Sequence, residues 1–173
     1  MSATAEGIDR RPRLIDRALS AAVLLGFLVF CYGTAALAAW ATLPEIDTWY
    51  RGIAKPSWTP PDRVFGPVWA VLYGTMAIAA WLVWREHLRI PVGGAMRPFF
   101  VQLALNLAWS FLFFRWHRPD LAVADIALLW VAIGATVVAF AVRRLAAGVL
   151  LLPYWAWAGF AALLNATVWR MND

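Results

Sequence analysis

The sequence predicts an all-α membrane protein, a single bundle of five transmembrane helices with a Pro/Trp-rich lid loop between the first and second helices. Two observations lead to this fold class. Of the 173 residues, 63% are hydrophobic, and the charged residues occur at intervals that leave five long apolar stretches. Because roughly 20 apolar residues, each rising about 1.5 Å, span a hydrocarbon core of about 30 Å, five such stretches account for nearly the whole chain.

The five helices are expected in order along the chain, at about residues 17–42, 64–84, 98–115, 121–142 and 147–169. The helix at 121–142 carries one charged residue, Asp125, and the core of each of the others carries none. The connections between them contain basic residues, glycines and prolines, which are typical of loops.

The N-terminal region is polar and lacks the short apolar stretch and cleavage site of a secretory signal. We expect residues 1–14 to form a disordered polar and basic tail, and residues 15–173 to form the transmembrane domain. The basic residues cluster at the helix ends, where they contact lipid headgroups, so nucleic acid is not an expected partner. Nine Lys and Arg on one side of the membrane against six on the other favour a cytoplasmic N-terminus.

The helix at 98–115 carries three polar side chains on one face. Gln102, Asn106 and Ser110 recur every four residues, and Trp109 and Phe113 flank them. In a bilayer such side chains either hydrogen-bond across helices or line a polar cavity. Three in register favour a cavity wall.

Two other helices present rings at helical spacing. The stripe of helix 64–84 consists of Phe65, Trp69, Tyr73 and Met76. The stripe of helix 147–169 consists of Tyr154, Trp157, Ala161 and Asn165. A single aromatic stripe is more typical of core packing, but three such faces together predict a mostly apolar pocket with a few polar groups. That pocket suits a large, flat and largely apolar ligand.

The segment WYRGIAKPSWTPPDRVFGPVWAVLY, residues 49–73, contains the connection between the first two helices. Its prolines restrict the backbone, so we expect a stiff lid and not a flexible linker. The rings that this lid can lay on the bundle are Trp49, Tyr50 and Trp58.

Motifs of enzymes and metal sites are absent from the sequence. His87 and His117 fall on opposite sides of the membrane, and Cys31 is the single cysteine, so no metal site and no covalent cofactor are expected. Asp125 is either a proton relay or ligand contact, or an interhelical partner near the interface. Its position in the first turns of a helix favours the interhelical role.

Three motifs resemble one family. These are WYxxxxKPSWTPPxxVFGPVWAVLYG, then QLALNLAWSFLFF, then LLPYWAWAGFAALLN. In this order and on these helices they are similar to the TspO/MBR family, the tryptophan-rich sensory proteins related to the mitochondrial translocator protein. The resemblance covers about Trp40 to Asn165.

The resemblance implies a five-helix bundle, usually a homodimer, in a bacterial cell membrane, inner or outer. It also implies a pocket that is lined by the first, second, third and fifth helices and closed by the first loop. The implied ligands are porphyrins such as protoporphyrin IX and haem, and drugs of the benzodiazepine-receptor type. The ligand-binding positions, from the motifs and the helix faces together, are Trp49, Tyr50, Trp58, Trp69, Tyr73, Asn106, Trp109, Ser110, Phe113, Tyr154, Trp157 and Ala161.

Three functions remain open at this point. The first is a tetrapyrrole receptor, sensor or transporter. The second is light-dependent oxidative breakdown of bound protoporphyrin IX, for which Trp69 and Trp157 would be the reactive pair. The third is a membrane scaffold whose pocket is empty or filled by lipid. Cholesterol is not favoured as the natural ligand, because the end of the last helix, LNATVWRMND, lacks the tyrosine of the proposed sterol motif.

Overall fold

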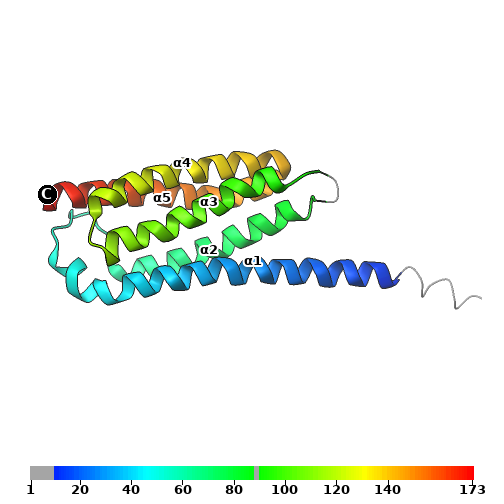
Figure 1. Cartoon of the computed structure of the whole chain (residues 1–173), viewed down its shortest axis with the longest axis horizontal. Coiled ribbons are helices and arrows are strands. Elements are labelled where there is room, and N and C mark those ends of the chain that lie inside the picture. Colours follow the sequence, from blue (N-terminus) through cyan, green and yellow to red (C-terminus); the bar gives the residue numbers. More distant parts are fainter. Residues whose placement is uncertain (1–9, 88–89) are drawn as a thin grey trace, which may run out of the picture.

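The computed structural model describes residues 10–87 and 90–173, which form five long helices running alternately up and down in one bundle (Figure 1). The helices are α1 Arg10–Glu45, α2 Asp62–Trp84, α3 Gly93–Ser110, α4 Pro119–Arg143 and α5 Leu145–Asn172. Two π-helical turns, η1 Ile46–Tyr50 and η2 Phe111–Arg115, continue α1 and α3. All five helical segments are long and apolar enough to cross a membrane. The predicted five-helix membrane bundle is confirmed.

The first helix is longer than the sequence pattern predicted. It begins at Arg10, so residues 10–14 are helical where we expected part of a disordered tail; residues 1–9 of that tail lie outside the described residues. Pro12 is compatible with this start because a proline in the first turn removes no intrahelical hydrogen bond. The remaining helix ends lie within five residues of the predicted ones, apart from the C-terminal end of α1.

The C-terminal end of α1 also differs from the prediction. Pro44 lies inside the helix, and the chain stays helical through η1 to Gly52. Pro44 has no N–H to donate, and the wider π turn follows directly after it. Thr48 Oγ1 donates a hydrogen bond of 3.0 Å to the carbonyl of Pro44 within this turn. The loop between α1 and α2 is therefore short, residues 53–61, and Trp49 and Tyr50 belong to η1 instead of the loop.

The helices contact one another in a closed order. α1 packs on α2 and α3, α2 packs on α5, and α4 packs on both α3 and α5. In α1 only 11% of the most apolar window is buried, against 33–39% in the other four segments. The first helix is thus a peripheral wall whose side chains largely face lipid, and it leaves room on its inner side.

α4 and α5 approach each other closely. A Cβ added to Gly148 would lie 2.6 Å from the Cβ of Ala141 and 2.9 Å from its Cα. Trp155 lies over Gly134, and Trp130 lies over Gly159. The two indoles stack with centroids 4.9 Å apart, and Trp155 Nε1 donates to Trp130 O at 3.0 Å. Small residues allow this close approach, as is typical of membrane helices.

The bundle has two different ends. At one end lie the loop 53–61, the turn between η2 and α4, and the C-terminus of α5; we call this the lid end (Figure 1). At the opposite end, Arg144 Nη1 donates to Glu86 Oε1 at 2.9 Å and joins the connections that follow α2 and α4. The lid end also contains a cavity between the helices.

Candidate functional site

A cavity of about 410 Å³ lies in the half of the bundle nearest the lid end. Its walls come from α1 with η1, from α2, from α3 with η2, and from α5, whereas α4 contributes none of the lining residues. Its volume is within the range of small-molecule pockets, about 300–1,000 Å³. The lining includes eight of the residues predicted for the site: Tyr50, Trp69, Tyr73, Asn106, Trp109, Ser110, Phe113 and Ala161.

The floor of the cavity is formed by Tyr73 and Asn106, which belong to a buried hydrogen-bond chain across three helices. Tyr73 Oη on α2 donates to Asn106 Oδ1 on α3 at 2.5 Å. Asn106 Nδ2 donates to Tyr154 Oη on α5 at 3.0 Å, and Tyr154 Oη in turn donates to Gln102 Oε1 at 2.7 Å. All four side chains are at most 2% exposed. The chain satisfies groups that would otherwise be costly to bury in a bilayer.

The polar stripe of α3 therefore has two functions. Gln102 lies below the floor, where it hydrogen-bonds Tyr154 and contacts Met76, and it does not line the cavity. Asn106 and Ser110 do line it. Of the two alternatives drawn from the sequence, interhelical bonding holds for Gln102, while Asn106 both joins helices and faces the cavity.

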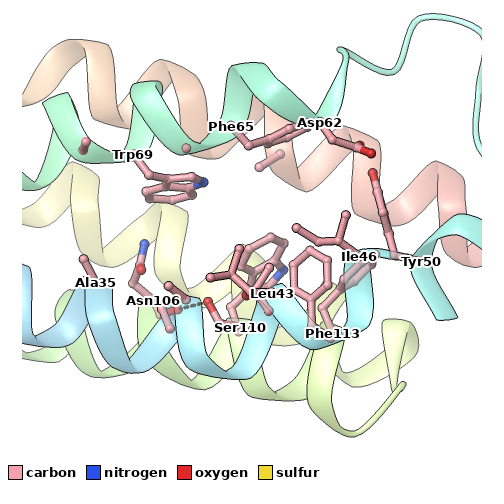
Figure 2. Close-up of a pocket in the computed structure, with 18 of the residues that line it drawn as sticks. Ala35, Leu43, Ile46, Tyr50, Asp62, Phe65, Trp69, Asn106, Ser110 and Phe113 are labelled. Carbon is pink, nitrogen blue, oxygen red and sulfur yellow. Dashed lines mark hydrogen bonds between the residues drawn. The ribbon is translucent and has the colours of Figure 1, made fainter. Parts of the chain in front are cut away.

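Rings form most of the remaining wall. The ring of Trp69 projects from α2 across the cavity from Asn106 (Figure 2). Trp109 stacks on Phe113 with centroids 5.6 Å apart and 21° between the planes. Trp109 Nε1 donates to Asn165 Oδ1 at 3.0 Å, which fixes the indole against α5. Among the residues that the structure describes, the indole N–H of Trp69 has no hydrogen-bond acceptor, so it is free to meet a ligand.

The mouth of the cavity lies at the lid end. Tyr50 and Asp62 face each other there from η1 and α2 (Figure 2). Lys55 donates hydrogen bonds to the carbonyls of Tyr50 and Ile53 and lies 4.6 Å above the ring of Tyr50. The positive charge of Lys55 at this position stabilises the C-terminal end of the first helix.

The loop 53–61 is fastened to the bundle but does not line the cavity. Asn172 accepts a hydrogen bond from Ala54 N and donates one to Ala54 O, both 2.9 Å long. Trp58 packs edge-on against Phe160 of α5 at 5.8 Å. The predicted stiff lid thus rests on α5, and Trp58, which we placed in the binding site, lies outside the cavity lining.

Three further predicted site residues also lie outside the lining. Trp49 stacks on His117 at 4.5 Å, on the outer side of η1. Tyr154 is fully buried below the floor. Trp157 packs between Phe65 and Phe160, and its buried Nε1 has no hydrogen-bond partner in the described part of the chain. The periodicity of α5 identified one face, but the cavity occupies only the lid-end half of that face.

The first helix is one of the walls that the family resemblance implied, but none of its lining residues was identified from the sequence. Its lining residues include Ala35, Ala38, Ala39 and Thr42, followed by Leu43 and Ile46. The spacing of the small residues, at i, i+3, i+4 and i+7, is the signal that could have identified this wall. Small side chains on one helix face leave space where large ones would fill it.

A metal centre does not emerge from the described residues. No group of three or more His, Cys, Asp or Glu side chains lies together there. Asp125 is buried on α4, and its Oδ2 has no hydrogen-bond partner in residues 10–87 and 90–173. The described residues therefore provide no hydrogen-bonding interhelical partner for this oxygen, contrary to the role that we favoured for Asp125.

Known proteins resemble this chain over most of its length. The model of the TspO/MBR family matches residues 27–170. The human translocator protein is 44% identical over 132 residues, which cover 72% of this chain and 75% of the human protein. The tryptophan-rich protein TspO of Chlorobaculum tepidum is 40% identical over 134 residues, 75% of this chain and 83% of that protein. The tryptophan-rich sensory protein of Cereibacter sphaeroides is 36% identical over 146 residues, 84% of this chain and 90% of that protein.

Proposed function

The chain belongs to the TspO/MBR family, and we propose that it is a membrane receptor, sensor or transporter whose cavity binds a tetrapyrrole such as protoporphyrin IX or haem. The observation that carries this proposal is the cavity of about 410 Å³ between α1, α2, α3 and α5, walled by aromatic rings and closed below by satisfied polar groups. The same cavity is expected to accept drugs of the benzodiazepine-receptor type.

The lining matches the chemistry of such a ligand. A tetrapyrrole is a flat aromatic body, and Trp69, Trp109 and Phe113 offer rings for contact with its faces and edges. Each aromatic pair contributes about 0.5–1.5 kcal/mol beyond area burial. Arg63 lines the mouth, where a ligand carboxylate has access to water and to a cation. The apolar body therefore fits inward and the acidic groups outward.

Quenching of tryptophan fluorescence by protoporphyrin IX in detergent tests this assignment. We expect saturable quenching in the wild type, and a roughly two- to tenfold weaker affinity in Trp69→Phe through the loss of one ring contact. Trp130→Phe is the matched control, because Trp130 lies on α4, which does not line the cavity. Equal affinities for the wild type and Trp69→Phe would contradict binding in this cavity.

A competition experiment distinguishes a ligand-binding receptor from a membrane scaffold. A benzodiazepine-receptor-type drug should displace protoporphyrin IX, and either ligand should raise the melting temperature of the purified protein, since a ligand that binds only the folded state stabilises it. A melting temperature that neither ligand moves would favour the scaffold function instead.

A second candidate function is light-dependent oxidative breakdown of bound protoporphyrin IX. Trp69 favours it, because its ring lines the cavity and lies 5.9 Å from Tyr73 and 6.2 Å from Tyr154. Trp157, the other member of the predicted reactive pair, lies outside the lining. The test is a product spectrum that requires light, oxygen and Trp69, and equal bleaching of free porphyrin under the same lamp argues against it.

The homodimer also stays a prediction, as does a bacterial cell membrane as its location. Ala104 is exposed on α3, and Ala108, one turn further, is half-buried. Small residues at this spacing allow close approach of a second helix. Crosslinking through a cysteine introduced at residue 104, in a Cys31→Ser background, would test this face.

A further inference from the structure

Glu45 lies where α1 passes into η1 and accepts hydrogen bonds from η2 and from the turn that follows it. Its Oε1 is 3.4 Å from Arg115 Nη1, and its Oε2 is 3.0 Å from His117 Nε2. Thr48 Oγ1 donates to Oε2 at 3.4 Å. The Glu45 side chain is only 14% exposed, whereas those of Arg115 and His117 are 49% and 41% exposed. The carboxylate is thus the least exposed member of the cluster.

His117 occupies a backbone conformation that favours glycine. Its φ is 51°, the one positive value among the described residues other than glycine. The ring stacks on Trp49 of η1 at 4.5 Å with 12° between the planes, while its Nε2 contacts Glu45. Glycine would adopt this backbone conformation with less strain than histidine does. The contacts of the imidazole offer a reason for histidine at this position.

The two π turns that this cluster joins are both part of the cavity wall. η1 contributes Ile46 and Tyr50, and η2 contributes Phe113 and Phe114. Tyr50 contacts both phenylalanines, with ring centroids 6.2 and 5.5 Å away. A change in the distance between η1 and η2 therefore changes the cavity near its mouth. π turns often occur at functional positions because their hydrogen bonds are less regular than those of an α-helix.

We propose that Glu45 is a positioning residue of the cavity, and that protonation of His117 tightens the contact between η1 and η2 and so raises ligand affinity as the pH falls. A protonated imidazole forms an ion pair with Glu45 and a cation–π contact with Trp49, whereas a neutral one forms only a hydrogen bond and a ring stack. The part of this proposal that concerns ligand affinity rests on the proposed function.

The other charged groups near His117 limit the size of the effect. Arg115 remains beside Glu45 when His117 is neutral, so the cluster is weakened and not abolished. Arg118 and Asp120 pair with each other, with nitrogen–oxygen distances of 2.9 and 2.6 Å. Both residues line a surface hollow together with His117 and Asp173. We therefore expect a change in affinity of severalfold between pH 8 and pH 5.5.

The binding test uses an uncharged aromatic carboxamide of the benzodiazepine-receptor type, because the probe must not titrate in this range. In the wild type we expect about three- to tenfold tighter binding at pH 5.5 than at pH 8. His117→Gln and Glu45→Gln should bind with no pH dependence. His87→Gln is the matched control and should behave as the wild type, since His87 stacks on Trp84 at the opposite end of the bundle. A pH dependence that persists in His117→Gln, or disappears in His87→Gln, would overturn the proposal.

A second measurement needs no ligand. Hydrogen exchange of the amides in residues 46–50 and 111–115, corrected for the intrinsic effect of pH, should be slower at pH 5.5 than at pH 8 in the wild type and equal at both in His117→Gln. Equal protection at both pH values in the wild type refutes the tightening whatever binds. If neither the carboxamide nor protoporphyrin IX binds at any pH while exchange still depends on pH, the proposed function is refuted and the coupling of η1 to η2 stands.

Discussion

The hydrogen bond between Tyr73 and Asn106 can be measured as a coupling between two helices. Both side chains are 2% exposed, and they are joined by an O–H···O bond of 2.5 Å. In Tyr73→Phe, Asn106 Oδ1 loses that bond and is left buried without a donor. In Asn106→Leu, the Tyr73 hydroxyl loses its acceptor, and Tyr154 loses the bond that it accepts, although it keeps its bond to Gln102.

The expected magnitudes come from membrane proteins, because the chain spans a bilayer. Interhelical hydrogen bonds there contribute about 0.6 kcal/mol on average and about 1.7 kcal/mol at most. The bond is short and fully buried, so we expect Tyr73→Phe to lower the free energy of unfolding by about 1–2 kcal/mol, and Asn106→Leu by about 2–3 kcal/mol since it disturbs two bonds. The double variant should cost about 1 kcal/mol less than the sum, because removing both partners leaves no unsatisfied group between them.

Unfolding by SDS in mixed dodecylmaltoside micelles, followed by far-ultraviolet circular dichroism, provides the free energies. Tyr32→Phe is the matched control: Tyr32 is 44% exposed, and its hydroxyl donates to a backbone carbonyl, that of Ala70. We expect that control to cost less than about 0.5 kcal/mol. If the costs of the Tyr73 and Asn106 changes simply add within about 0.3–0.5 kcal/mol, the two residues are independent and the reasoning fails.

Three further predictions concern other contacts. Gly148→Ala should destabilise the bundle by about 1–3 kcal/mol in the same SDS assay, because its new Cβ meets the backbone of α4, whereas Gly33→Ala, with no other atom within 4 Å, should be near neutral; equal effects would contradict the close approach. Asn172→Ala should speed amide hydrogen exchange in residues 53–61 through loss of the two bonds to Ala54, and unchanged exchange would mean that those bonds do not hold the loop. Asp125→Asn should be neutral or stabilising, because it removes a charge whose buried Oδ2 has no partner among the described residues; a loss above about 1 kcal/mol would point to a partner of the carboxylate.

The positions of all five helices could be predicted because a segment that crosses a membrane must consist mainly of apolar residues. About 20 apolar residues must follow one another, and this requirement is visible without knowledge of packing. The helix ends were less predictable, since charged and proline residues were interpreted as loop. α1 contradicts that rule at both ends: it includes Pro12 and continues past Pro44 into η1. A proline excludes one hydrogen bond, but it does not exclude a π turn that follows it.

The sequence indicated which helix faces line the cavity, but not how far along the helices the cavity extends. Helical periodicity identified the inward faces of α2, α3 and α5, and eight of twelve predicted residues line the cavity. Periodicity assigns an angle around a helix and carries no information on how far along the axis a cavity extends. Tyr154 is therefore on the correct face but beneath the floor. Trp49 and Trp58 were assigned to a lid over the ligand, whereas their rings rest on His117 and Phe160.

The pairing of polar groups around the cavity determines what kind of recognition it can perform. Tyr73 and Asn106 already bond each other, and the indole N–H of Trp109 is held by Asn165. Within the described part of the chain, the Trp69 N–H is unpaired, and the hydroxyl of Ser110 makes only a long bond of 3.4 Å to its own helix. A ligand therefore meets few directional donors and a large ring surface. The cavity is therefore expected to select its ligands by shape and by ring stacking. It discriminates weakly between molecules of similar outline, because its wall is largely hydrophobic. Under the proposed function, one cavity would then accept both a porphyrin and an unrelated flat drug, with Trp69 as the position at which a hydrogen-bond acceptor on either would be favoured.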